Sequence, residues 1–306
     1  MKKRYKILLT LAAITAGTQA INQTIFKLSN KTKPKNNLFR IEWRHGIIKY
    51  RVFGKGEPLL LIHNTFIGSS MAEWKELALK LSKNYTVYCI DLLGFGFSDK
   101  PNLTYSAYLY VSLINDFVAE VIGQKTFAIA SNDSCGFLVS AALVAPDNFK
   151  KLILVSPSIG KEKKSYLKDP SNRLIKKIIE LPIFGTFVYN MLASKNHIRY
   201  YLEEHAYYDD SLVSKEMIEN YHKCAHHMNS NVKIPIASFM AGDFNLDLEK
   251  QLAKLKTPSC LVFGEESEIP PIKGYKGKTS HIPKTRLYPH SEKSKEFSNI
   301  CLKFFE

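Results

Sequence analysis

The sequence predicts an α/β protein with a mostly parallel central sheet that helices cover on both faces. Three observations lead to this expectation. Strand-like apolar runs alternate with segments of helical apolar spacing across residues 41–158. The strand runs are continuously apolar, as expected of strands buried on both faces. The alternation stops over residues 159–245 and then resumes, which indicates a helical insertion before the last strands.

Each element of this sheet has its own pattern. "IIKYRVFG" and "PLLLIH" are strand-like runs on either side of "GKGE", which suggests a hairpin-type connection. After them, helical and strand patterns alternate through "AEWKELALKLSK", "YTVYCIDLLG", "AYLYVSLINDFVAEVI", "FAIAS", "GFLVSAALVA" and "KKLILVSP". The insertion is rich in Tyr and Lys, as in "NRLIKKIIELPIFGTFVYNMLA". A helix and strand, "LEKQLAKLKTPSCLVFG", and a last turn and helix, "RLYPHSEKSKEFSNICLKFF", complete the chain.

The organisation predicted for the chain has five parts. Residues 27–40 are polar and rich in lysine and contain one Pro, which predicts a linker between the N-terminus and the folded core. The expected parts are an N-terminal signal peptide or membrane anchor (1–26), the linker (27–40), the first part of the core (41–158), a helical lid (159–245) and the second part of the core (246–306).

The charge of the chain argues against a nucleic-acid partner. Lys and Arg number 43 against 28 Asp and Glu, giving a formal net charge of +15. The excess is mostly lysine and is spread along the chain, without the Arg-rich or aromatic stripe of a nucleic-acid groove. Attraction to an anionic membrane surface is the favoured use of this charge.

The N-terminus has the layout of a signal peptide or signal anchor. A basic head precedes a mostly apolar run from Ile7 to Ile21, and the residues 18–20 (Thr-Gln-Ala) would permit cleavage. The run is short, so a tight span, an interfacial helix and a helix packed on the domain all stay open. Basic residues flank it on both sides, so we expect membrane association with the side of the membrane undecided.

Cysteine and histidine usage predicts neither a disulfide framework nor a metal site. The cysteines number five, an odd count, and several lie in apolar runs. His222 and His226 have metal-ligand spacing on an expected helix, with Cys224 and His227 nearby, but no third ligand is evident. We expect a polar helix face there, with no metal and no cofactor.

The turn between the strand "FAIAS" and the next helix is the candidate reactive site. A residue at the apex of so sharp a turn takes an uncommon backbone conformation and needs small residues two positions away on either side. Ser134 at the apex would have Asn132 and Gly136 as these neighbours. Asp133 at the apex would have Ser131 and Cys135 instead. Ser134 is favoured, with a helix N-cap as its alternative role.

Several motifs resemble one known family. "LLLIHN", "IDLLGFGFSDKP", "NDSCG", "LKTPSCLVFGE" and "PHSEKSKEF" are similar to segments of the α/β-hydrolase superfamily, in its branch of lidded esterases, haloperoxidases and dehalogenases. The resemblance covers nearly all of residues 41–306. It implies the α/β-hydrolase fold, with a mostly parallel sheet and a helical lid.

The resemblance also implies roles for residues at the turn. Ser134 takes the place of the nucleophile, and the backbone N–H groups of Thr65 and Cys135 take the place of the oxyanion hole. In the register shifted by one residue, Asp133 is the nucleophile, as in dehalogenases and epoxide hydrolases.

The family's catalytic triad is degenerate in this sequence. Ser267 stands where the acid is expected, and Glu268 beside it is the candidate substitute, with Glu266 as the alternative. Leu287 stands where the histidine is expected, so His290, or less favourably His281, would have to reach Ser134 through a rearranged loop.

Together these observations predict a membrane-associated serine hydrolase that cleaves a small lipophilic ester through an acyl-enzyme on Ser134. This hypothesis requires an imidazole nitrogen within about 3 Å of the Ser134 hydroxyl. Two alternatives stay open. One is a catalytically impaired binding or scaffold protein that keeps the fold, and the other is a dehalogenase or epoxide hydrolase that depends on Asp133.

Overall fold

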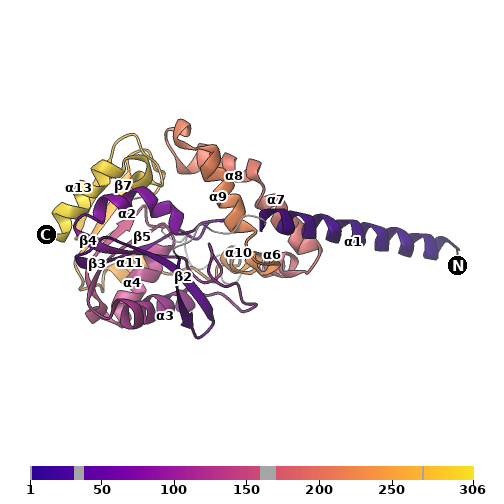
Figure 1. The fold of residues 1–306 in the computed structure, drawn as a ribbon, viewed down its shortest axis with the longest axis horizontal. Coiled ribbons are helices and arrows are strands. Elements are labelled where there is room, and N and C mark those ends of the chain that lie inside the picture. Colours follow the sequence, from indigo (N-terminus) through magenta and orange to yellow (C-terminus); the bar gives the residue numbers. More distant parts are fainter. Residues whose placement is uncertain (1, 31–37, 159–169, 271) are drawn as a thin grey trace.

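The computed structural model describes residues 2–30, 38–158, 170–270 and 272–306 (Figure 1). A sheet with helices on both sides forms the main body. A group of helices lies beside this body, and the first helix, α1 (Lys2–Ser29), projects away from that group.

The sheet has eight strands in the order β1-β2-β4-β3-β5-β6-β7-β8. The first two strands pair antiparallel with each other, and β2 also pairs antiparallel with β4, whereas all the other pairs are parallel. The strands are β1 (Phe39–Trp43), β2 (Gly46–Phe53), β3 (Glu57–Ile62), β4 (Tyr85–Ile90), β5 (Thr126–Ser131), β6 (Phe149–Val155), β7 (Ser259–Gly264) and β8 (Lys278–Ile282).

Helices follow most of the strands and form the group beside the sheet. Those of the core are α2 (Lys75–Leu81), α3 (Ala107–Phe117), α4 (Ser134–Val144), α11 (Leu248–Leu252), α12 (Pro289–Glu292) and α13 (Ser294–Phe305). Those between β6 and β7, which we call the insertion, are α6 (Pro170–Glu180), α7 (Phe184–Leu192), α8 (Lys195–Tyr201), α9 (Lys215–Ala225) and α10 (Lys233–Met240).

The central strands bury side chains on both faces of the sheet. In β3, Leu60 and Ile62 pack into one apolar core, together with Tyr110 of α3 and Phe137 of α4. The residues that alternate with them pack into a second core on the other face, which also contains Phe297 of α13. Burial on both faces explains why the strand sequences are continuously apolar, and it confirms the predicted α/β-hydrolase architecture.

Two details of the sheet differ from the expectation. The connection "GKGE" does not close a hairpin, because β4 lies between β2 and β3 and pairs with both. The hairpin is formed instead by β1 and β2, joined at Trp43 and Gly46. The edge strands β1 and β8 had no expected counterparts. Both are short and largely exposed, so their sequences lack the apolar runs that revealed the central strands.

The C-terminal half of α1 is fixed to the insertion by two asparagines. Asn22 is 3% exposed, donates to the Ile183 carbonyl (3.0 Å) and accepts from the Asn190 amide (2.9 Å). Asn30, which directly follows α1, donates to the His226 carbonyl (2.9 Å) and accepts from the Met228 N–H beyond the end of α9 (3.0 Å). Within the described parts of the chain, no helix is both long enough and apolar enough to span a bilayer.

Candidate active site

The turn between β5 and α4 has its uncommon backbone conformation at Asn132. Its φ is +49°, whereas Asp133 has helical angles and Ser134 is already the first residue of α4. This corrects the expected apex, which was Ser134 or Asp133. The small residues two positions from Asn132 are Ala130 and Ser134, so Ser134 fills the place of a small residue beside the apex.

The Ser134 hydroxyl is buried in the protein. Ser134 is 0% exposed, and its Oγ donates to the backbone carbonyl of His63 at 2.6 Å. His63 lies at the end of β3, so this hydrogen bond ties the start of α4 to the neighbouring strand. The contact gives Ser134 a structural role that does not depend on an imidazole partner.

The two N–H groups expected in the oxyanion hole are already hydrogen-bonded within the chain. The Thr65 N–H donates to the side-chain oxygen of Asn64 (2.7 Å), and the Cys135 N–H donates to the Asn132 carbonyl (3.1 Å). Asn64 stands where the family motif has glycine, and its side chain therefore occupies the donor that the family aims at the substrate.

The structure brings His290 to Glu73 and not to Ser134. His290 is 1% exposed, and its Nε2 lies 3.2 Å from Glu73 Oε1, within ion-pair distance. Neither ring nitrogen of His290 has a partner with hydrogen-bond geometry, so the hydrogen bond expected between an imidazole and Ser134 is absent for this histidine.

The Glu73 carboxylate joins several parts of the site. One oxygen accepts from the Ser131 hydroxyl at the end of β5, and the other accepts from the Asn64 N–H at 3.0 Å. Glu73 belongs to a short 3₁₀ helix, Met71–Trp74, and thus links this helix, the loop beside Thr65 and the turn. Sequence reasoning did not identify this residue, because its partners are distant along the chain and no motif marks it.

The remaining expected triad positions lie apart from Ser134. Glu266 and Glu268 are exposed, as is His281. The Ser267 hydroxyl donates to the carbonyl of Gly264 (2.7 Å), which is the end of its own strand. Leu287 is half-buried, and its N–H donates to the carbonyl of Ala206 in the insertion (3.0 Å). No proton acceptor occupies the position of the family histidine.

Asp133 is the ionisable side chain that the turn presents. The residue is partly exposed, and its carboxyl group accepts from the hydroxyl of Thr65 at 3.3 Å. Burial raises the pKa of this carboxyl, while hydrogen bonds from Ser158 and Thr65 oppose the increase. Beside it, the Asn132 side-chain nitrogen is buried without a hydrogen-bond partner. A carboxyl group and an unused amide donor therefore belong to consecutive residues of the turn.

The motif "DLLGFGFSDKP" builds the loop beside the turn. The Asp91 carboxylate accepts from the Met71 N–H (2.6 Å) and the Phe97 N–H (2.8 Å). At Gly96, with φ +49°, an added Cβ would lie 2.2 Å from the Asp91 carboxyl carbon, so only glycine fits. His63 Nε2 accepts from the Leu92 N–H (3.1 Å), so the His63 proton is on Nδ1. These motif residues are structural.

Tyr201 of the insertion and Tyr288, which precedes α12, close over the loop that contains Asn64. The Asn64 amide donates to the Tyr288 hydroxyl at 2.9 Å, and Tyr288 is 0% exposed. Tyr201 of α8 shares hydrogen bonds with both of these residues, and its ring stacks on Phe66 with 3.6 Å between the ring centroids. A substrate must displace this contact to reach the turn from the side of the insertion.

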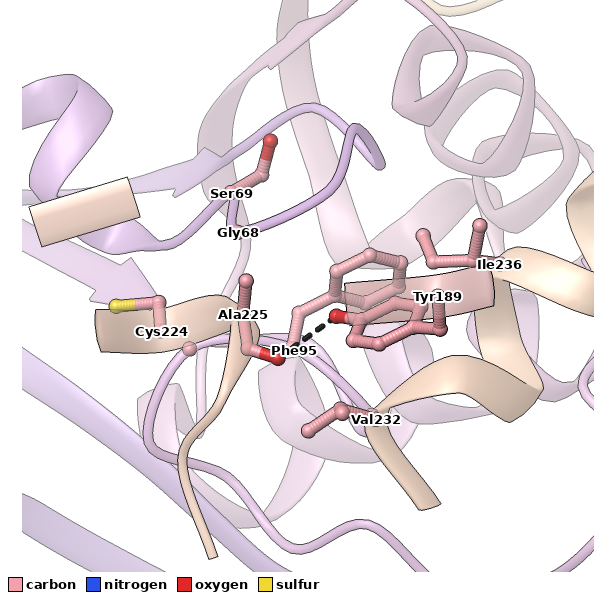
Figure 2. Close-up of a pocket in the computed structure, with 10 residues that line it drawn as sticks. Gly68, Ser69, Phe95, Tyr189, Cys224, Ala225, Val232 and Ile236 are labelled. Atoms are coloured by element: carbon pink, nitrogen blue, oxygen red, sulfur yellow. Dashed lines mark hydrogen bonds between the residues drawn. The ribbon is translucent and has the colours of Figure 1, made fainter. Parts of the chain in front are cut away.

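A small cavity lies where the insertion meets the core (Figure 2). Its volume is ≈ 10 Å³, about enough for one water molecule. The Tyr189 hydroxyl donates to the Ala225 carbonyl (2.7 Å) at its edge. Ser69 also lines it, and the buried Ser69 Oγ has no partner, which suits a single bound water. The cavity is too small for an ester substrate.

The expected polar helix face at His222 and His226 has a structural role. The His226 Nδ1 donates to the His222 carbonyl at 2.8 Å, and the two rings lie with their centroids 4.4 Å apart. Among the described residues, no group of three or more His, Cys, Asp or Glu side chains is arranged to hold a metal ion.

Comparison with known proteins identifies the family. The model of the α/β hydrolase fold family matches residues 58–290. An uncharacterized protein of Mycobacterium tuberculosis is 33% identical over 107 residues, which cover 35% of this chain and 31% of that protein. The match thus spans less than a third of that relative. The pimeloyl-acyl-carrier-protein methyl ester esterase of Aliivibrio salmonicida is 27% identical over 240 residues, covering 75% of this chain and 82% of the esterase.

A solved structure agrees with this assignment at the level of the fold. The crystal structure of Cfl2 from Burkholderia cenocepacia has a TM-score of 0.73 at 14% identity, covering 88% of this chain and 95% of Cfl2. Because the family model matches more than half of the sequence, the chain belongs to the α/β hydrolase fold family. This membership, with an esterase among the relatives, supports an enzyme of the hydrolase class.

Proposed function

We propose that the protein hydrolyses an ester or a related acyl bond with a water molecule that Asp133 activates. The observation that carries this proposal is the pair of adjacent groups in the turn. Asp133 is a partly exposed residue that offers a carboxylate, and the preceding residue, Asn132, offers a buried side-chain N–H donor without a partner. A base and an oxyanion donor on consecutive residues of the turn provide what the attack of water on a carbonyl requires.

The proposed reaction balances without a covalent intermediate. The Asp133 carboxylate takes a proton from water as the water oxygen bonds to the carbonyl carbon. The carbonyl oxygen gains negative charge and accepts a hydrogen bond from the Asn132 amide. When the bond to the leaving alcohol breaks, the Asp133 carboxyl returns the proton to that alcohol. The raised pKa of Asp133 makes its carboxylate a stronger base.

The substrate class follows from two considerations. The A. salmonicida relative is named an esterase, which supports an ester. The exposed side chains of the insertion include many large apolar ones, such as Leu181, Phe184 and Met191, which favours a lipophilic substrate. We propose that the insertion acts as a lid, because Tyr201 of α8 must leave Tyr288, Asn64 and Phe66 before a substrate reaches the turn.

Asp133 is favoured over Ser134 because the contacts of Ser134 are already complete. Its hydroxyl is buried on the His63 carbonyl, and the N–H groups of Thr65 and Cys135 donate within the chain. An acyl-enzyme on Ser134 would need all three contacts to rearrange and a histidine to approach. A second use of Asp133, direct attack on an alkyl halide or epoxide, would leave an ester on the carboxylate.

The test is hydrolysis of p-nitrophenyl butyrate by the full chain and three variants. Asp133→Asn should lower kcat/KM by about 10²–10⁴-fold, and Asn132→Ala by about 10²–10³-fold. Ser134→Ala is the matched control, one residue away, and should stay within about threefold of the parent. The rate should fall as the pH falls through the pKa of Asp133, since the base must be deprotonated.

Other outcomes would identify a different chemistry. A fluorophosphonate adduct on Ser134 would show that this serine is the nucleophile and would overturn the proposal. Release of halide from a haloalkane, abolished by Asp133→Asn, would make Asp133 the nucleophile. Mass spectrometry of that reaction would find the alkyl group on Asp133.

One observation favours a binding function without catalysis as the second candidate. Leu287 stands in the position of the family histidine, and no triad contact to Ser134 is formed. A ligand with an oxygen acceptor would pair with the free amide of Asn132. Binding of an ester analogue that is lost in Asn132→Leu, with no hydrolysis by the parent protein, would support this candidate.

Membrane association belongs to the same proposal. The first helix has exposed apolar side chains and a basic head, and the chain carries a net charge of +15. An interfacial helix fits these features better than a membrane-spanning one, because α1 does not contain an apolar stretch long enough to cross a bilayer. Sedimentation of the full chain with vesicles tests this point.

A further inference from the structure

Exposed apolar side chains are concentrated on α1 and the insertion. All but four of the exposed large apolar residues in the described chain lie there; the exceptions are Phe39, Leu79, Tyr108 and Val144. Surface apolar residues scattered singly are ordinary, but a concentration on one part of a molecule marks an interaction surface.

The exposed residues of α1, α6 and α7 belong to neighbouring elements. The first helix packs against α7 through Asn22, which bonds to Ile183 and Asn190, and α7 packs in turn on α6. Figure 1 shows these three helices together on the side of the molecule away from the sheet. We use the name docking face for eight exposed apolar residues, seven in these helices and Leu181 between α6 and α7: Ile7, Leu9, Leu11, Ile14, Leu174, Leu181, Phe184 and Met191.

The charges around the docking face match an anionic surface. The sequence of α1 contains no acidic residue, and four basic residues lie in its first five positions: Lys2, Lys3, Arg4 and Lys6. On α6, Arg173 and Lys177 are exposed beside Leu174. Basic residues that flank exposed apolar ones are typical of surfaces that bind anionic lipids.

We propose that α1, α6 and α7 dock together on an anionic lipid bilayer, so that the insertion faces the membrane. This inference rests on the membrane association proposed above and adds which face of the folded protein meets the lipid. The asparagine contacts of Asn22 and Asn30 hold α1 to the insertion. A bilayer that binds α1 therefore also meets the apolar side chains of α6 and α7.

Tryptophan reporters test this orientation in the full chain. The native Trp43 and Trp74 are buried, so their signal should not change. Phe184→Trp places a reporter on the docking face, and Tyr108→Trp places a matched one on an exposed position of α3. With vesicles of brominated phosphatidylcholine and one-third phosphatidylglycerol, emission from Trp at 184 should be quenched, and emission from Trp at 108 should not.

Sedimentation with the same vesicles tests the contribution of α1. The double change Leu9→Glu and Leu11→Glu should lower the partition coefficient at least about tenfold, because burial of one leucine contributes roughly that factor. Val144→Glu, an exposed apolar position on α4, is the control and should bind like the parent. Binding should weaken in pure phosphatidylcholine and at high salt.

Three results would overturn the inference. The first is quenching at neither reporter while the protein stays bound, which would mean that α1 anchors the chain without its insertion. The second is equal loss of binding in the Val144→Glu control. The third is a dimer in solution that shields Trp at 184, which would make a second copy the occupant of the face. All these readouts report binding, so they do not depend on whether the protein hydrolyses esters.

Discussion

Asn64 and Asn132 determine the chemistry of the turn. The side-chain oxygen of Asn64 takes the Thr65 N–H that the family uses for an oxyanion. Asn132 takes the strained apex, where a family nucleophile is expected, and leaves its amide nitrogen unpaired. Under the mechanism proposed above, both changes favour Asp133, a partly exposed residue, over Ser134 as the reactive group.

Glu73 gives a prediction at the same scale. Glu73→Leu removes the acceptor for the Asn64 N–H and the Ser131 hydroxyl, and leaves two buried donors unpaired. Each such group costs about 1–3 kcal/mol, so we expect a loss of about 2–5 kcal/mol in the free energy of unfolding, measured with urea.

Glu73→Gln is the matched variant for this prediction. The amide keeps the length of the side chain and one acceptor, and it can donate to the Ser131 oxygen. It should therefore recover most of the stability lost in Glu73→Leu. Equal destabilisation in both variants would mean that the negative charge, which lies 3.2 Å from His290, matters more than the hydrogen bonds.

Among the elements, the contact between α1 and the insertion centres on His226. Its backbone carbonyl accepts from Asn30, and its ring meets Phe26 edge-on with 5.3 Å between the ring centroids. Burial lowers the pKa of His226 to about 4, although the hydrogen bond to the His222 carbonyl opposes the decrease. The docked α1 therefore requires a neutral ring at this position.

The pH dependence of this contact follows from the direction of the shift. When α1 detaches, the pKa of His226 returns toward its ordinary value near 6.5, so the detached form binds more protons between pH 6.5 and pH 4. The docked form loses stability as the pH falls through that window. We expect faster hydrogen exchange in residues 18–30 at pH 5 than at pH 7.5, after correction for intrinsic rates.

His226→Phe provides the control for the pH effect. Phenylalanine keeps a ring beside Phe26 and carries no titratable proton, so the difference between the two pH values should shrink. His205→Phe changes a histidine that lies outside this contact and should leave the difference unchanged. The same pH dependence in the His226→Phe variant as in the parent would assign the effect to other groups, of which His227 is the first to examine.

For the molecule as a whole, the cysteines provide a measure of packing. All five are free and buried, and burial raises the pKa of the Cys89, Cys135 and Cys301 thiols. A neutral buried thiol does not react with a disulfide reagent. We expect no rapid reaction with dithionitrobenzoate in the native protein and five thiols in guanidinium chloride.

A reporter cysteine makes this measurement quantitative. Val144→Cys places a thiol at a position where the native side chain is 72% exposed, and it should add one rapidly reacting group. Rapid reaction of a thiol in the parent protein would show local opening of the core. The thiol that reacts would identify the element that opens, since each cysteine belongs to a different segment of the chain.

Much of the architecture could be predicted from sequence because burial on both faces leaves a clear pattern. The central strands β3 to β7 are mostly apolar, and the helices between them have regular spacing. The edge strands and the β2–β4 pairing were missed for a physical reason. Edge strands need few apolar residues, and pairing partners far apart in the chain leave no local signal.

The amino-acid sequence by itself determined the family, the sheet with its insertion, and the loss of the family residues at Ser267 and Leu287. Only the tertiary structure decided that Asn132 is the apex, that Ser134 is sealed on His63, and that His290 meets Glu73. The reason is that a motif defines only the order of neighbouring residues. The contacts of Ser134 with His63 and of His290 with Glu73 join separate segments, and the same motif allows more than one residue at the apex. Which hydroxyl or carboxyl group is available for chemistry depends on partners that only folding brings together.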